Sequence, residues 1–200
     1  MNIETYEWGI DVYCGDAPCA KLSRIVVDPE EGVVTDIIVE QGLLMKKAHV
    51  VPRRHVQQTD ERGIWLTMTE EELAEARPYK RRVIEEVADG YDQAAIGVPT
   101  ANASAADMAA LPTVSRVVHD GVASSDMRVL GQDVSVRDLI QEKNVGKLNQ
   151  VVVDAESGEI VQFEVAGGLF GEDFTLPASM VRHYDEDRIL IDEEAAKGVD

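Results

Sequence analysis

Cysteine is scarce in this sequence, because the chain of 200 residues contains only Cys14 and Cys19. In a reducing compartment two such cysteines are expected to be free thiols. A structural zinc site would need two further ligands, and the sequence has no second cysteine pair. We therefore predict neither a metal centre nor a redox function at these cysteines.

Long apolar runs are also absent, since none approaches the roughly 18 residues that a membrane-spanning helix requires. The first residues, Met1 to Asp11, contain acidic side chains and no basic one, which is not the charge pattern of a signal peptide. These two observations predict a cytoplasmic protein without membrane insertion.

Basic residues are the minority charge, with 19 Lys and Arg against 38 Asp and Glu and a formal net charge of -19. Such a surface repels phosphate groups, so nucleic acid or an anionic bilayer is not expected as a partner. The excess is greatest from Asp154 to Asp200. We interpret this region as a solvated acidic face, with a docking face for a basic partner as the alternative.

Sequence motifs for catalysis are missing as well. The chain has no Gly-rich phosphate loop, no Gly-x-Ser-x-Gly elbow and no His-Glu-x-x-His pair. The histidines are not spaced by one helical turn, and we expect them at the surface or at strand edges: His49, His55, His119 and His183. We predict no catalytic, cofactor-binding or metal-binding residues and no enzyme activity.

What the chain does contain is a repeat, because the stretch Lys21–Gly32 returns as Lys147–Gly158. Each copy is an apolar strand followed by a turn that starts with Asp and ends with Gly. An Asp at the start of a turn accepts backbone N–H bonds, and Gly takes positive φ without steric cost. We therefore assign structural turn roles to four residues: Asp28, Gly32, Asp154 and Gly158. A carboxylate pair formed by the two Asp residues is the weaker alternative.

The return strands predict the core face through their alternation of apolar residues. In the first copy this face contains Val33, Ile37 and Val39. In the second copy it contains Val161, Phe163 and Val165.

A Gly-containing corner, a short strand ending in Pro and a last hairpin follow in both copies. So many short bent strands without an intervening helix favour closure into a small barrel.

The region between the copies has a different composition. Thr69 and Glu72 form a capping box that predicts a short helix through Ala76. The apolar residues Val83, Ile84 and Val87 predict a second helix over Lys80–Ala88. The Ala-, Ser- and Gly-rich stretch Tyr91–Asp126 predicts a mobile linker with one helical turn near residues 107–111. The predicted domains are residues 1–79 and 127–200, joined by a linker over residues 80–126.

The order of these motifs resembles the PRC-barrel family. The second copy carries the closer match, with Gly146-Lys147-Leu148, the Asp154–Gly158 turn, Gly168-Leu169-Phe170-Gly171 and Leu176-Pro177. The first copy departs from the pattern at Ala20 and at Lys46-Lys47. The resemblance implies an all-β fold with two small PRC-type β-barrels in tandem, joined by a linker with short helices.

The resemblance also implies a function, because the family includes the cytoplasmic part of the photosynthetic reaction-centre H subunit and the C-terminal domain of a ribosome-maturation protein. Both are described as adaptors that contact proteins. We therefore expect a non-catalytic binding or scaffold protein that uses a protein partner or self-association, through pseudo-twofold barrel pairing or a homodimer. The alternative is a small-ligand or metal-sensing domain that uses the interface between the barrels. The copies differ most at a possible interaction surface: Lys46, Lys47, Arg53, Arg54 and Phe170.

Overall fold

The computed structural model describes residues 2–42, 46–87, 113–140, 143–167, 172–185 and 187–192. It divides into two compact units, one of residues 1–80 with 121–200 and the other of residues 81–120. Regular structure is mostly β-strand, and the described residues contain one α-helix, α1 (Glu70–Glu75). The predicted all-β class is confirmed.

The larger unit contains two open β-sheets. The eight-stranded sheet has the order β6 (Val56–Asp60), β7 (Gly63–Leu66), β2 (Asp11–Cys14), β3 (Ala17–Asp28), β4 (Val33–Gln41), β5 (Lys47–Pro52) and β8 (Arg77–Pro78), with β11 (Arg128–Gly131) beside β3. The seven-stranded sheet has the order β15 (Phe174–Pro177), β14 (Ile160–Gly167), β13 (Asn144–Asp154), β12 (Ser135–Asp138), β17 (Arg188–Ile191) and β16 (Val181–Tyr184), with β1 (Ile3–Glu7) beside β13. Neither order closes on itself, so the structure shows bent open sheets where the sequence predicts closed barrels.

The repeated sequence forms the same elements twice, and we call residues 3–66 the first repeat and 128–191 the second repeat. Strands β3 and β4 join through one Asp–Gly turn, and β13 and β14 join through the other. Strands β5 and β15 both end at Pro, as predicted, and a 3-10 turn follows each: η1 (Arg53–His55) and η2 (Ala178–Met180). Proline lacks the N–H that a longer ladder would need.

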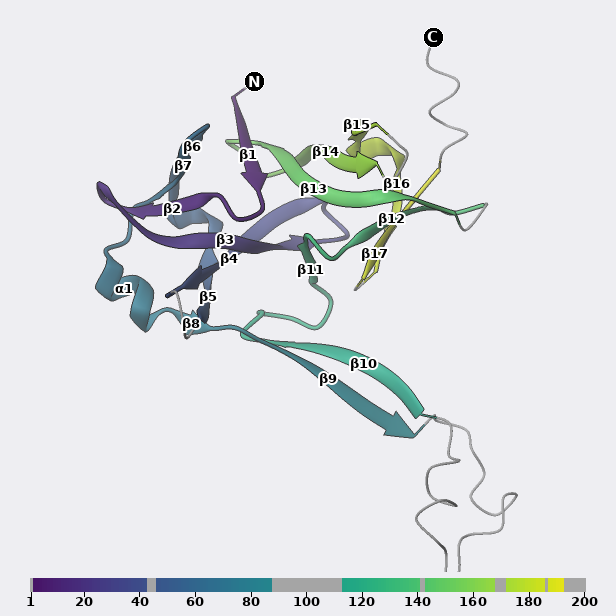
Figure 1. Cartoon of the computed structure of the whole chain (residues 1–200), viewed down its shortest axis with the longest axis horizontal. Coiled ribbons are helices and arrows are strands. Elements are labelled where there is room, and N and C mark those ends of the chain that lie inside the picture. Colours follow the sequence, from purple (N-terminus) through teal and green to yellow (C-terminus); the bar gives the residue numbers. More distant parts are fainter. Residues whose placement is uncertain are drawn as a thin grey trace, which may run out of the picture. The chain divides into compact units, whose positions relative to one another are not determined.

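The first strand of each repeat pairs with the other repeat (Figure 1). Strand β1 is antiparallel to β13, with Tyr6 opposite Val151, and β11 is antiparallel to β3, with Leu130 opposite Ile25. The alternation of Tyr6, Trp8, Ile10 and Val12 predicts a first strand after an entry segment, but Gly9 has φ +83° and turns the chain between β1 and β2. That turn separates β1 from its own repeat and lets it pair with the second one.

Side chains from both repeats share one hydrophobic core. Its largest members are almost fully buried: Tyr6, Leu22, Ile25, Ile37, Ile64, Leu73, Leu130, Leu148, Phe163 and Ile189. Exchanged strands and a shared core make the two repeats one packing unit.

The predicted core faces are right at four of six positions. Ile37, Val39, Phe163 and Val165 are buried in the shared core. Val33 and Val161 are only half-buried, and their neighbours Val34 and Ile160 are in the core instead. A β-bulge in each hairpin shifts the register there, opposite Val26–Val27 and opposite Val152–Val153. One extra residue reverses the alternation, which the sequence pattern does not reveal.

A second, smaller hydrophobic cluster covers the other face of β3, β4 and β5. It contains Val26, Ile38, Val50, Tyr79 and Val129. Strand β8 also pairs with the edge of β5, so this edge of the first repeat is covered. In the second repeat the corresponding outer face carries polar residues, among which Thr175 donates to Glu164 Oε1 at 3.0 Å.

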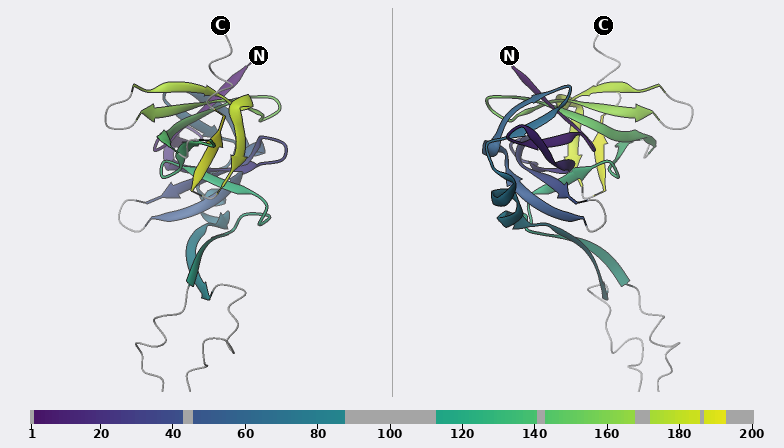
Figure 2. Two further views of the ribbon diagram at one scale, coloured as in Figure 1. Left: turned by 90° about the vertical axis from the view of Figure 1, so that its right-hand side faces the viewer. Right: turned by 60° about the vertical axis from the view of Figure 1, so that its left-hand side comes forward.

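The smaller unit contains a two-stranded hairpin of β9 (Lys80–Val87) and β10 (Thr113–Asp120), seen from two sides in Figure 2. The predicted helix over Lys80–Ala88 is therefore wrong, and part of the predicted linker is strand. The β-branched residues of this segment favour a strand once β10 supplies a hydrogen-bonding partner. The predicted helical turn at residues 107–111 lies outside the described residues.

The predicted capping box at Thr69 and the predicted free thiols at Cys14 and Cys19 have different outcomes. The capping box is confirmed, because Thr69 Oγ1 accepts from Glu72 N at 3.2 Å and Glu72 Oε2 accepts from Thr69 N at 2.8 Å. Free thiols at Cys14 and Cys19 are wrong, since the two form a disulfide with Cα atoms 5.7 Å apart. In the antiparallel pairing of β2 with β3, Cys14 lies opposite Ala17, and Cys19 lies at the register shift between Pro18 and Ala20.

Candidate functional site

The two Asp–Gly turns lie at the junction of the repeats, and each is held by its own Asp. Asp28 Oδ1 accepts from the amides of Glu30 at 2.9 Å and Glu31 at 3.2 Å. Asp154 Oδ1 accepts from the amides of Ser157 at 2.9 Å and Glu156 at 3.0 Å. These hydrogen bonds from backbone amides lower the pKa of Asp154 below its usual value, and the bond from the Ser157 amide has the largest effect.

The turns also bond to each other in a reciprocal way. Val34 N donates to Gly158 O at 2.9 Å, and Ile160 N donates to Gly32 O at 2.9 Å. Gly32 has φ +67° and Gly158 has φ +78°, which side chains other than glycine rarely adopt. Val34 lies opposite Val27 and Ile160 lies opposite Val153, and both amides bond across the junction rather than within their own hairpins.

On one side of the junction an ion-paired cluster of Arg53, Glu4 and Tyr6 fills the space beside the second turn. Arg53 Nη2 donates to Ala155 O at 2.6 Å, to Glu4 Oε2 at 3.0 Å and to Asp154 O at 3.2 Å. The Tyr6 hydroxyl donates to the same Glu4 oxygen at 2.8 Å. The side chains of Arg53 and Glu4 are only 15% and 10% exposed. We call these three residues the Arg53 cluster.

Burial governs the chemistry of this cluster. Desolvation, followed by the charge of Glu4, raises the pKa of Tyr6 well above its usual value. Tyr6 therefore stays protonated and keeps donating to Glu4. The cluster ties β1 and η1 of the first repeat to the turn of the second, so its first role is structural.

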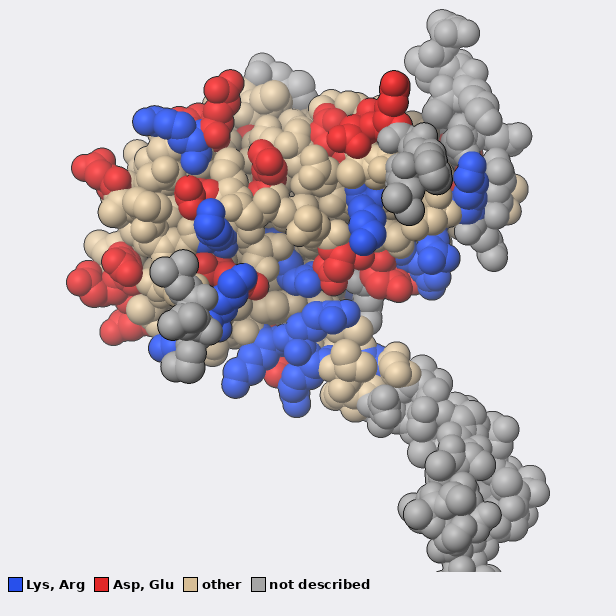
Figure 3. Space-filling model, in the orientation of Figure 1, with Lys and Arg blue, Asp and Glu red and all other residues tan. Residues whose placement is uncertain are grey.

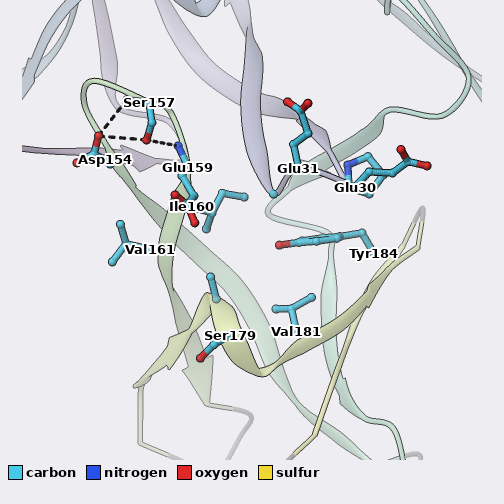
Figure 4. A pocket seen from close by; sticks show the side chains of 13 residues that line it. Glu30, Glu31, Asp154, Ser157, Glu159, Ile160, Val161, Ser179, Val181 and Tyr184 are labelled. Atoms are coloured by element: carbon cyan, nitrogen blue, oxygen red, sulfur yellow. Dashed lines mark hydrogen bonds between the residues drawn. The ribbon is translucent and has the colours of Figure 1, made fainter.

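On the other side of the junction there is a hollow of about 570 Å³ beside Gly32 (Figure 4). We call it the Gly32 hollow. Its lining comes from both turns, the start of β14, η2 and β16: Pro29, Glu30, Glu31, Gly32, Asp154, Ser157, Glu159, Ile160, Val161, Ala178, Ser179, Val181 and Tyr184. In Figure 4, Glu30 and Glu31 lie at the rim, and the Tyr184 ring extends into the hollow with its hydroxyl leading.

The two sides of the junction can be compared residue by residue. Ile37 lies opposite Val51 and Phe163 lies opposite Leu176, so Pro52 corresponds to Pro177 and Arg53 to Ala178. Beside Gly158, a Cβ atom would meet the Arg53 guanidinium at 3.0 to 3.2 Å. Beside Gly32, a Cβ atom would meet nothing within 4 Å. The space filled by Arg53 on one side is therefore open on the other.

Tyr184 is the polar group most buried in this hollow. The residue is 8% exposed, and its hydroxyl makes no hydrogen bond to any residue that the structure describes. Burial raises its pKa to about 12, so the hydroxyl is protonated at neutral pH and can donate as well as accept.

The residues of the predicted interaction surface have different environments in the structure. Arg53 is inside the junction, whereas Arg54 and Lys47 are exposed. Lys46 Nζ lies 2.8 Å from Glu40 Oε2, and this bond is the main reason that the pKa of Glu40 is lowered. Phe170 lies outside the described residues. Lys46 also lines a separate hollow of about 500 Å³ with Trp8, Arg24 and Asp133.

The histidine prediction is wrong for His49. This residue is 5% exposed on β5, which lies between β4 and β8 rather than at a sheet edge. Its Nδ1 lies 3.2 Å from Ala76 O, just after α1. His183 is exposed on β16, as expected. The packing of α1 over β5 covers His49, which the local sequence does not indicate.

Charges on the face drawn in Figure 3 lie interspersed, with acidic and basic side chains both present over the surface. Among the described residues, no group of three or more His, Cys, Asp or Glu side chains is placed to hold a metal ion. Within the same residues, no helix has the length and apolar character needed to cross a membrane.

The second repeat carries a family signature. Residues 133–197 match the protein-family model of the PRC-barrel domain. This domain contributes β12 to β17, and with them most of the Gly32 hollow. A comparison with curated proteins found no match.

Sequence reasoning located the turns and named Arg53 as part of a possible interaction surface, but it missed the burial of Arg53 and it missed Tyr184. Both stand at positions where the repeats differ, Arg53 against Ala178 and Tyr184 against Thr59. The difference at Arg53 is part of the predicted interaction surface, and a position-by-position alignment of the two repeats would have marked Tyr184 as well.

Proposed function

We propose that the protein is a non-catalytic binding and scaffold module that acts through protein–protein contacts of two PRC-type barrels in tandem. The barrels would be residues 1–79 and 127–200. The observation that carries this proposal is the Gly32 hollow at the place where the two repeats meet. It is a concave surface whose Tyr184 hydroxyl and glutamate carboxylates have no partner among the described residues.

The proposal that the first repeat is a diverged second barrel draws on four features shared with the PRC-barrel domain. These are the strand order, the position of the bulge, the strand-ending Pro and the 3-10 turn. The exchanged strands and the reciprocal bonds between Gly32 and Ile160 and between Gly158 and Val34 support pseudo-twofold barrel pairing.

Self-association has support from a sheet edge that has no neighbouring strand among the described residues. Strand β15 ends the seven-stranded sheet, whereas its counterpart β5 is covered by β8. An uncovered edge presents unpaired N–H and C=O groups to a strand of another chain. A homodimer or a partner strand at β15 is therefore part of the proposal.

A second candidate function is a small-ligand sensor that uses the same junction. The volume of the Gly32 hollow, about 570 Å³, lies in the range of small-molecule sites and favours this candidate. Against it, typical ligand sites are lined mainly by apolar side chains, and here acidic and hydroxyl groups make up much of the lining.

The two candidates can be separated by one experiment on the full chain. The tagged protein is recovered from extract of its native cells under non-denaturing conditions, and bound material is measured by native mass spectrometry. The binding-module proposal predicts a protein partner in defined stoichiometry or a homodimer. A monomer that carries a small molecule and no protein would contradict it and favour the sensor.

A further inference from the structure

We propose that the Gly32 hollow is an arginine pocket, which receives the guanidinium group of an arginine side chain on a protein partner. This inference rests on the proposed function, because it names the chemistry by which a partner protein would be recognised.

The chain itself provides the template for this mode of binding. Beside Gly158, the Arg53 guanidinium lies against the glycine and donates to the carbonyl oxygens of the turn residues Asp154 and Ala155. The corresponding turn residues beside Gly32 are Asp28 and Pro29. No described residue donates to the Pro29 carbonyl, and Ala178 stands where the first repeat has Arg53.

The hydroxyl of Tyr184, a residue that is largely buried, provides an independent indication of a ligand. A polar side chain that is only 8% exposed normally has a hydrogen-bond partner, and Tyr184 has none among the described residues. Its hydroxyl extends into the hollow (Figure 4), where it can accept an N–H bond, and an aromatic ring also attracts a guanidinium by cation–π interaction.

The charges around the hollow favour a cation. Glu30, Glu31 and Glu159 form no ion pair with any residue that the structure describes. The nearest cation in an adjoining hollow is Arg128, which occupies the position equivalent to Glu4. Arg128 donates through Nε to the carbonyl oxygen of Tyr184 and through Nη1 to those of Ser125, Asp126 and Met127, and it does not line the Gly32 hollow.

The spacing of the acceptors favours arginine over a metal ion or lysine. The acidic groups of the described residues do not converge on a point, as a metal ion would require. A guanidinium presents five N–H donors in a plane and can bond to separated carbonyl, hydroxyl and carboxylate oxygens at once.

The test is a titration of the full chain, labelled with ¹⁵N, with N-acetyl-arginine amide. The matched probe is N-acetyl-citrulline amide, which has nearly the same shape without the charge. We expect saturable shifts of the Gly32 and Glu31 amides in the millimolar range, and about tenfold weaker binding of citrulline, since a charged donor is replaced by a neutral one. Equal binding of the two probes, or shifts outside the hollow, would overturn the proposal.

Two substitutions make the test specific. Ala178→Arg should fill the hollow with the chain's own guanidinium and abolish binding, whereas Asn149→Arg adds the same charge at an exposed position of β13 and should leave binding unchanged. Glu159→Gln, which risks little for folding, should weaken binding about two- to fivefold. Full binding by both Ala178→Arg and Glu159→Gln would contradict an arginine pocket.

The same variants distinguish this inference from the proposed function. If the protein partner is recovered equally by the wild type and by Ala178→Arg, the binding module stands and the arginine pocket is wrong. If no partner is recovered with the wild type while arginine amide binds the hollow, the proposed function fails and the pocket stands.

Discussion

Replacing Arg53 by alanine is the most informative perturbation of the junction. Among the described residues, the change removes the donor to the Ala155 carbonyl and leaves Glu4, 8% exposed, bonded to the Tyr6 hydroxyl without a cation. Removing one partner of a buried ion pair costs about 3–5 kcal/mol. Because the Arg53 and Glu4 side chains remain 15% and 10% exposed, we expect the lower end, a loss of about 3 kcal/mol in the free energy of unfolding.

Urea unfolding followed by tryptophan fluorescence measures this loss. Arg54→Ala is the matched control, because its side chain is exposed one residue further along η1, and it should cost less than about 0.5 kcal/mol. Arg53→Met combined with Glu4→Gln should recover much of the stability, since no unpaired charge remains in the junction. If Arg53→Ala costs no more than Arg54→Ala, the structural role of the Arg53 cluster is refuted.

Three further predictions concern the turn, the exchanged strand and the disulfide. The pKa of Asp154 is lowered in the folded state, so the stabilisation that its carboxylate gives is present above the ordinary pKa of 3.8 and is lost as the pH falls through the folded pKa. Asp154→Asn should therefore lose less stability than the wild type during acid unfolding, and identical acid profiles would contradict the assignment. Leu130→Ala removes a fully buried side chain of β11 and should cost about 2–5 kcal/mol in urea unfolding, and a cost under about 1 kcal/mol would count against the pairing of β11 with β3. The double variant Cys14→Ser, Cys19→Ser opens a short loop of sequence separation 5 and should lower the free energy of unfolding by about 2 kcal/mol relative to the oxidised protein. Unchanged stability, together with a wild-type mass higher by two hydrogens than that of the oxidised chain, would show that the disulfide is absent.

Local signals in the sequence predicted local structure well. The Asp at the start and the Gly at the end of each repeated turn specify that turn independently of tertiary contacts, because both residues act on the backbone of the turn itself. The same holds for the Thr69 capping box and for the strand-ending Pro52 and Pro177, which act within three residues of their own position.

Long-range pairing could not be read from the sequence. Strand β1 has the alternation of any half-buried strand, and nothing in it distinguishes β13 from β3 as its partner. Likewise, Val83 and Ile84 fit a helix face as well as a strand, and the pairing with β10 decides between them. These outcomes depend on contacts between residues far apart in the chain.

The candidate site was predictable only in part. We predict that binding surfaces lie where the repeats differ, and this prediction includes Arg53. It treats Arg53 as an exposed cation, whereas the structure buries it. Its burial depends on Glu4, which the exchange of β1 brings beside η1. The Gly32 hollow exists because Ala178 is small at the equivalent position, and this contrast becomes meaningful only after both turns are seen to meet.

The central claim is that the two repeats form one folded unit through exchanged strands. It is tested most directly by placing a protease site between Val87 and Thr113, cleaving the folded protein and measuring the products by size-exclusion chromatography with light scattering. The exchanged strands predict that both fragments elute together at the mass of the intact chain and unfold in one cooperative transition. Separation into two folded, monomeric fragments would contradict the claim.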